Sequence, residues 1–127
     1  MRYLFIKALV FIGLIYFPLH SCTNKHELPD PLMAGWKGSK VCEIIEDNEE
    51  LRVLRCTFAP GVGHERHYHD PHFGVALSGS TFRITDATGT REVDVPGNSQ
   101  FYSDGTEWHE VLNVGDSTAV FLIIEPK

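Results

Sequence analysis

Four histidines, His64, His67, His69 and His72, fall within nine residues in the middle of this 127-residue sequence. Imidazole nitrogens are common ligands of divalent transition metals. His67 and His69 are two residues apart, so on an extended strand both side chains point to the same side. His109 lies far along the chain. Two histidines on one face of a strand, completed by a distant third, are typical of mononuclear metal sites in β-proteins. The sequence therefore predicts a metal centre.

The other two histidines of this segment have different expected roles. His72 follows an Asp-Pro step and begins an apolar strand, and we expect it to be a further ligand. His64 lies three residues before His67, so on a regular strand it points to the opposite face and away from the site. Gly74 and Ala76 share the face of His72, and such small residues leave open volume beside a metal. A purely structural site would be closed by bulky side chains.

The elements that must position these histidines are strands. Seven prolines and eleven glycines separate short β-branched and aromatic runs, a pattern that predicts an all-β fold with many turns. No segment shows a helical period. We expect eight or nine short strands, forming a single sandwich or small barrel, at residues 40–46, 50–59, 66–69, 73–78, 81–85, 90–95, 99–102, 107–112 and 118–125.

Composition and charge restrict the partners. The chain is 43% hydrophobic and 22% charged, as in ordinary globular proteins, with a net charge of −6. That charge argues against nucleic acid, which would need a basic face. Residues 119–124 are apolar on both faces of their strand. A strand buried on both sides predicts packing between sheets and allows a homodimer.

The N-terminus reads as a targeting segment. Arg2 and Lys7 precede an apolar run over residues 8–19, which is short for a membrane span of about 20 residues but typical of a signal peptide. The run ends in Leu19-His20-Ser21-Cys22, which resembles a bacterial lipobox, at which Cys22 is lipidated and residues 1–21 are removed. Such a protein is exported and held in the bacterial cell envelope, touching the membrane only through its lipid. A simple secretory signal and a short membrane anchor are the alternatives.

Residues 22–39 read as a tether and residues 40–127 as the barrel domain. The tether is rich in proline and also contains Trp36, which could instead pack against the barrel; the sequence does not decide between the two. In the barrel, Cys42 and Cys56 fall at similar heights of an expected hairpin. In an exported protein this favours a disulfide, although two buried thiols in neighbouring strands fit the pattern equally well.

The histidine segment resembles the first motif of the cupin superfamily, which usually reads G-x5-H-x-H-x3-4-E-x6-G. Here Gly61 is followed by five residues, then His67, Tyr68 and His69, two residues, His72, six residues and Gly79. The second cupin motif usually reads G-x5-P-x-G-x2-H-x3-N. The matching positions here are Gly97, Ser103, Gly105, His109 and Asn113.

The resemblance covers residues 40–126 and implies a single cupin-type double-stranded β-helix, or jelly-roll, barrel. It also implies a metal held by His67, His69 and His109. His72 replaces the usual glutamate, one residue closer to His69 than usual. Ser103 replaces the usual proline, and one extra residue precedes His109. The resulting all-histidine set favours Fe(II), Ni(II), Cu(II) or Zn(II) over the harder Mn(II).

Three functions remain open at the level of sequence, because cupins host many chemistries on one scaffold. The first is a metal-dependent enzyme acting on a small molecule, either an oxygenase or an isomerase or lyase with the metal as Lewis acid. The second is a non-catalytic module that binds a small ligand or a metal at the cell surface. The third is a metal-free barrel. No carboxylate in the motifs is an evident general base, since we expect solvent exposure for the four that flank the ligands: Glu65, Asp70, Glu107 and Glu110.

Overall fold

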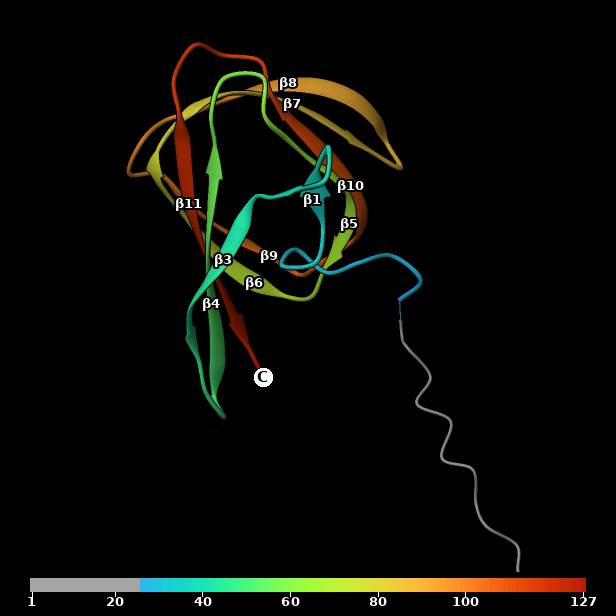
Figure 1. The fold of residues 1–127 in the computed structure, drawn as a ribbon, viewed down its shortest axis with the longest axis vertical. Coiled ribbons are helices and arrows are strands. Elements are labelled where there is room, and N and C mark those ends of the chain that lie inside the picture. Colours follow the sequence, from blue (N-terminus) through green and yellow to red (C-terminus); the bar gives the residue numbers. More distant parts are fainter. Residues whose placement is uncertain (1–25) are drawn as a thin grey trace, which may run out of the picture.

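The structure is a computed structural model that describes residues 26–127. Within that range it contains strands and no helix, which confirms the all-β fold class. The strands (Figure 1) are β1 (Gly35–Trp36), β2 (Ser39–Lys40), β3 (Cys42–Asp47), β4 (Leu51–Phe58), β5 (Gly63–His69), β6 (His72–Ser78), β7 (Ser80–Asp86), β8 (Gly89–Val95), β9 (Gln100–Ser103), β10 (Thr106–Asn113) and β11 (Ala119–Pro126). Every strand expected from the sequence is present, with ends shifted by a few residues at most. β1 and β2 were not expected.

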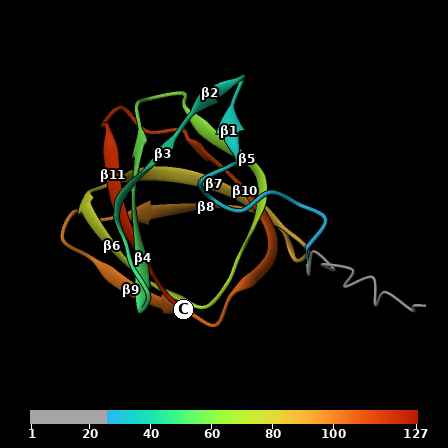
Figure 2. The same cartoon turned by 60° about the horizontal axis from the view of Figure 1, so that its bottom comes forward.

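Two antiparallel sheets face each other and enclose the core (Figure 2). One has the order β3-β4-β11-β6-β9 and the other β5-β10-β7-β8. Apart from the pairs β3-β4 and β7-β8, neighbouring strands in each sheet are not consecutive in the sequence, as in a jelly roll. Because β5 and β10 are neighbours, a histidine near residue 67 and one near residue 109 lie side by side.

The core lies between the inner faces of the two sheets. On β4, Leu54, Cys56 and Phe58 alternate inward and are buried, as their spacing predicts. The Phe58 ring makes edge contacts with Phe82 from the opposite sheet and with Phe121, at centroid distances of 5.4 and 5.9 Å. The contact between Phe58 and Phe82 joins the two sheets across the core.

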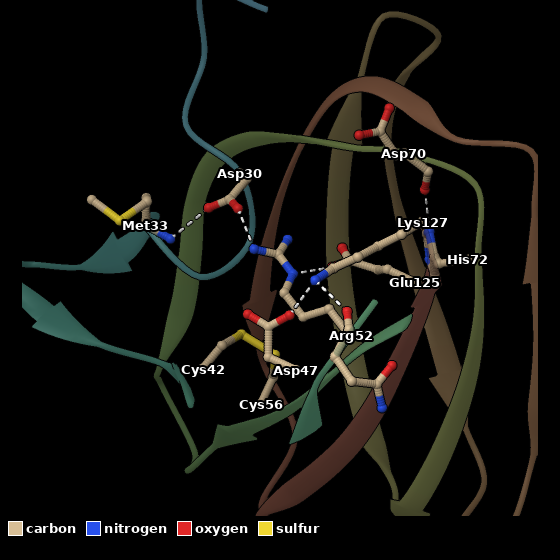
Figure 3. A network of polar contacts seen from close by, with 11 residues as sticks. Asp30, Met33, Cys42, Asp47, Arg52, Cys56, Asp70, His72, Glu125 and Lys127 are labelled. Carbon is tan, nitrogen blue, oxygen red and sulfur yellow. Dashed lines mark hydrogen bonds and ion pairs between the residues drawn. A yellow bond between two sulfur atoms is a disulfide. The ribbon is translucent and has the colours of Figure 1, made fainter. Parts of the chain in front are cut away.

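Cys42 and Cys56 are direct partners in the register of β3 and β4. The structure joins them by a disulfide (Figure 3). Both residues are buried, so the bond staples the edge strand β3 to the core.

The described part of the N-terminal segment, residues 26–39, packs on the barrel, which corrects the tether expected there. Pro31 and Ala34 are buried, and Trp36 packs against the core. A short hairpin of β1 and β2 follows. Gly63 of β5 lies so close to the Trp36 ring that a Cβ there would be 2.7 Å from it. The folded domain therefore begins before residue 40. Of the two alternatives for Trp36, the structure shows packing against the barrel.

An ion-pair network fixes this segment (Figure 3). Arg52 of β4 donates from Nη1 to Asp30, at 2.7 Å, and from Nε to Glu125 of β11, at 2.6 Å. The apolar contacts of this segment produce no helix or strand pattern in the sequence. The Arg52 ion pairs join residues far apart in the chain, so local sequence does not predict them either. This is why the segment reads as a tether in the sequence.

The expected signal peptide, residues 1–21, and the expected lipidation site, Cys22, lie outside the described residues. Among residues 26–127, no helix is long and apolar enough to cross a membrane.

Candidate metal centre

Three histidines converge on one point inside the barrel. His67 and His69 lie on β5 and point inward, and His109 lies on β10 directly opposite His67. The Nε2 atom of His67 is 3.0 Å from Nε2 of His69 and 3.0 Å from Nε2 of His109. The three residues form a group whose nitrogens lie within 4.8 Å of one another and that could hold a metal ion.

The backbone sets the tautomer of His67. Its Nδ1 atom lies 2.6 Å from the carbonyl oxygen of Glu65. A carbonyl only accepts, so Nδ1 carries the proton and Nε2 presents a lone pair. A ligand histidine is usually oriented in this way, with its second nitrogen donating to a backbone carbonyl or carboxylate.

Burial keeps the three rings neutral. It lowers the pKa of His67 to about 2, with the neighbouring imidazoles His64 and His109 adding to the effect. It likewise lowers the pKa of His109 to about 4 and strongly lowers that of His69. Neutral imidazole is the form that binds a metal, so the ligands are ready at neutral pH.

The protein alone does not satisfy the hydrogen bonds of these rings. His69 Nδ1 is buried and has no partner within residues 26–127. Nε2 of His67 has one lone pair, but two nitrogens lie 3.0 Å from it: Nε2 of His69 and Nε2 of His109. One lone pair cannot fully serve both as hydrogen-bond donors. Two nitrogens bound at about 2.1 Å to one metal are about 3.0 Å apart at a right angle and about 3.4 Å apart in a tetrahedron. The donor set and its spacing fit a divalent metal.

His72 lies beside this group but is not a member of it. Its ring centroid is 4.5 Å from that of His69, and its Nδ1 donates to the carbonyl of Asp70 at 2.8 Å (Figure 3). This leaves the Nε2 lone pair of His72 available. Ligation by His72 stays a prediction.

His64 lies in the same cavity, which corrects the expectation that it points away from the site. Its ring centroid is 3.9 Å from that of His67. A break in the register between β5 and β10 is the cause: His67 faces His109 and His64 faces Val111, so three steps on β5 match two on β10. Such a bulge places two consecutive residues outside, here Glu65 and Arg66, and returns His64 to the inner face.

The Nε2 atom of His64 lies 3.0 Å from the carbonyl oxygen of Pro31, to which it donates. Burial lowers the pKa of His64. The ring is therefore a neutral support that lies between the N-terminal segment and His67.

The histidines line one side of a cavity of about 350 Å³. Gly74 and Ala76 are buried on the inner face of β6, as their parity predicts, but they do not form the cavity wall. The ring of Phe101 fills the space beside Gly74, where a side chain would clash with it. Two charged residues, Asp86 and Arg91, also line the cavity. Neither residue belongs to the two histidine motifs. The signal that could have found them is alternation, because Asp86 continues the inner face of 81–85 and Arg91 lies on the inner face of 90–95.

Comparison with solved structures identifies the architecture. A cupin domain from Bordetella pertussis matches with a TM-score of 0.64 at 23% identity, over 68% of this chain and 92% of that one. The chain has the cupin fold. An RmlC-like cupin with a double-stranded β-helix from Methanocaldococcus jannaschii matches with a TM-score of 0.57 at 12% identity, over 73% and 87% of the two chains.

The polyketide cyclase RemF from Streptomyces resistomycificus matches with a TM-score of 0.55 at 15% identity, over 75% and 73% of the chains. A scan against family models and a search of curated proteins gave no match. The cupin fold therefore hosts an enzyme among these neighbours, while identities this low extend the likeness to the fold alone.

Few carboxylates of the described residues could act on a molecule in the cavity. The carboxylates that flank the ligands in sequence, namely Glu65, Asp70, Glu107 and Glu110, are all exposed, as expected. Asp86 is the acidic residue of the cavity wall. Its pKa is lowered to about 2 by hydrogen bonds from Thr88 and Arg91, so it is an ionised acceptor and a weak base.

Proposed function

We propose that this protein binds one divalent transition metal through His67, His69 and His109, and that the metal serves an enzyme acting on a small molecule in the cavity. The observation that carries the proposal is the convergence of three neutral imidazoles on one point: His67 and His69 are buried and His109 is partly buried, and Nε2 of His67 lies 3.0 Å from Nε2 of each of the other two. A buried polar cluster whose hydrogen bonds are incomplete is costly unless a ligand completes it.

A bound metal of this class would supply redox or Lewis-acid chemistry. The chain contributes the rest. The Glu65 carbonyl orients His67, and the His64 ring packs against it. The ring of Phe101 packs edge-on against His72 and forms part of the cavity wall. Asp86 is a weak base, but His72 on the cavity wall has an available Nε2 lone pair, and histidine is the commonest general base. Oxygenase chemistry and isomerase or lyase chemistry therefore both stay open.

Metal stoichiometry tests the site. Purified protein is reconstituted with Fe(II), Ni(II), Cu(II) or Zn(II), desalted and analysed for elements. We expect about one metal per chain in the wild type and loss of metal in His67→Ala and His109→Ala. His26→Ala is the matched control, because His26 stacks on Tyr68 outside the cavity. Metal retained in His67→Ala, or absent from the wild type, would refute the site.

The rival function is a non-catalytic module that binds a small ligand or the metal itself. The observation that favours this module is that Asp86, the acidic residue of the cavity wall, is a weak base. Oxygen uptake by the Fe(II)-loaded protein, with small chelating phenols and hydroxy acids as probes, separates the two. Uptake that requires the probe and is lost in His109→Ala supports the enzyme. Binding of the probes without uptake supports the module.

We also propose that the protein is an exported lipoprotein held through Cys22. The disulfide between Cys42 and Cys56 supports export, because disulfides persist in oxidising compartments. Labelling with a fatty acid tests the anchor. The wild type should incorporate the label and Cys22→Ala should not, and label in the Cys22→Ala protein would contradict the proposal.

A further inference from the structure

A cationic side chain faces the inside of the barrel on its edge strand. Arg91 of β8 is the register partner of Ile84 on β7, and Ile84 is the partner of Val111 on β10. Directly opposed residues of antiparallel strands share a face, so Arg91 lies on the same inner face as these two apolar residues. Arg91 is part of the cavity wall.

Arg91 is held by Asp86, which in turn lies opposite His109. Nη1 of Arg91 donates to Oδ2 of Asp86 at 2.8 Å, and Asp86 is the register partner of His109. The other carboxylate oxygen of Asp86 accepts from the backbone and hydroxyl of Thr88, at 2.9 and 2.6 Å. Both carboxylate oxygens of Asp86 therefore have partners, and the bonds to Thr88 fix the side chain to its turn.

Arg91 is not saturated. A guanidinium offers five N–H donors in a planar fork, and within residues 26–127 only Nη1 has a partner. The side chain is half exposed (50%), whereas that of Asp86 is mostly covered (18%). This geometry presents the remaining N–H groups at the mouth of the cavity, where they can accept a planar anion in a bidentate way.

Protection of the sheet edge is the alternative explanation, since inward charges on edge strands can prevent unwanted pairing. The β7-β8 hairpin already carries a charged pair on its outer face. Arg83 of β7 and Glu92 of β8 are register partners and form an ion pair at 2.9 Å. A second ion pair, between Arg91 and Asp86 on the inner face, adds little protection to the edge strand. It also places a charge beside a cavity whose wall is mainly apolar beyond the histidines.

The cavity defines the rest of the ligand. About 350 Å³ is at the small end of ligand pockets, which run from about 300 to 1,000 Å³. Beyond the histidines, the wall consists mainly of aromatic and aliphatic side chains, including Phe82, Phe101, Ile84 and Val111. We propose that the cavity takes a small, single-ring or similarly compact apolar molecule carrying one carboxylate, and that Arg91 binds this carboxylate while the apolar part lies toward the histidines.

This substrate class rests on the proposed function in that the molecule would lie beside the metal. The Arg91 contact itself is independent of the metal. A binding experiment on both the metal-free and the Zn(II)-loaded protein therefore separates a failure of the metal site from a failure of the carboxylate site.

The test uses benzoate as the probe and benzamide, its neutral counterpart of nearly the same shape. Binding is measured by calorimetry or by shifts of amide resonances, in wild type, Arg91→Gln and Arg83→Gln. Arg83→Gln is the matched control, because it removes an arginine from the outer face of the same hairpin. Metal stoichiometry is measured in each variant and should not change.

We expect the wild type to bind benzoate at least about tenfold more tightly than benzamide, and Arg91→Gln to lose that preference while Arg83→Gln keeps it. Resonances of β8 and of the cavity wall should shift. Equal binding of benzoate and benzamide, unchanged benzoate affinity in Arg91→Gln, or no benzoate binding in either metal state would overturn the proposal. Stability should fall little in Arg91→Gln, because the lost ion pair is half exposed; a large loss would instead identify Arg91 as an edge-strand clamp and overturn it as well.

Discussion

The imidazole ring of His64 lies against that of His67, with centroids 3.9 Å apart and planes tilted by 37°. His64 also donates to the carbonyl of Pro31. One ring thus connects the N-terminal segment to a candidate metal ligand. The orientation of His67 depends on this contact as well as on the Glu65 carbonyl.

Replacing His64 tests this connection. His64→Ala opens a cavity beside His67 and leaves the Pro31 carbonyl without its donor, so we expect a loss of about 2–3 kcal/mol in the free energy of unfolding. Metal affinity should fall about tenfold, as for residues that orient a ligand. His64→Phe keeps the ring and should recover most of the affinity. Urea denaturation and competition with a chelator measure the two effects. Complete loss of metal in both variants would make His64 a ligand.

The metal-free domain should be unstable in mild acid. Burial lowers the pKa of His67 to about 2 and that of His109 to about 4, below the ordinary value near 6.5. Between those values the unfolded chain binds protons that the folded chain does not. Stability is therefore fully present above about pH 6.5 and is lost as the pH falls, by about 1.4 kcal/mol per pH unit for each such histidine.

Urea denaturation of the metal-free protein at pH 7.5, 6.5, 5.75 and 5 measures this dependence. Carboxylates titrate mostly below that range, so histidines dominate the slope. His109→Gln removes one of the groups and should make the slope shallower by about 1.4 kcal/mol per pH unit. A wild-type stability that is constant from pH 6.5 to 5 would contradict the expectation.

The Arg52 network should be a main source of order for the N-terminal segment. Arg52→Met leaves Glu125, which is 6% exposed, without its partner. We expect a loss of about 2–3 kcal/mol and earlier proteolysis near Asp30, since Arg52 and Asp30 are only about one-fifth exposed. Arg55→Met is the control: its pair with Glu43 is exposed and 3.5 Å long, so its loss should cost less than about 0.5 kcal/mol.

The disulfide should stabilise the domain by about 3 kcal/mol, as expected for a closed loop of this size, with a sequence separation of 14. Urea denaturation of the oxidised protein and of Cys42→Ala/Cys56→Ala measures the difference. Mass spectrometry of non-reduced peptides checks the bond in protein from the cell envelope. Two thiols open to alkylation there would exclude it.

The outer face of the five-stranded sheet should associate with a second copy of the chain. Phe73, Leu77 and Tyr102 are 38%, 47% and 65% exposed on this face, beside the apolar strand β11. Large apolar patches of this kind mark interfaces. We expect a dimer by light scattering and a monomer for Leu77→Lys, while Thr90→Lys on the opposite sheet keeps the dimer. A monomeric wild type at high concentration would contradict this.

Much of the fold follows from local patterns in the sequence. Alternation along β4 and β6 places Leu54 and Ala76 on the inner face without knowledge of the partner strands. The pairing of Cys42 with Cys56 follows from the length of one hairpin. The His67, His69 and His109 group follows from parity on β5 and from the spacing of the two motifs.

The remainder depends on contacts between distant segments. The bulge that brings His64 inward arises from the register of β5 against β10, and parity along β5 alone gives the opposite answer. Alternation places Asp86 and Arg91 on the inner face of their strands, but only the closed barrel brings these positions to the cavity of the histidines. Trp36 packs on Gly63, a contact that no local pattern encodes.

The packing of the N-terminal segment also sets how far the barrel can stand from a membrane. The backbone joins the barrel at Pro29, whose carbonyl accepts from Tyr68 N. His26 already stacks on the ring of Tyr68. If Cys22 carries the lipid, the chain from Cys22 to His26 separates the lipidated residue from the barrel, and it spans at most about 14 Å when fully extended. A connection that short would hold the barrel near the lipid headgroups and restrict its rotation. Molecules could then approach the cavity only from a limited range of directions.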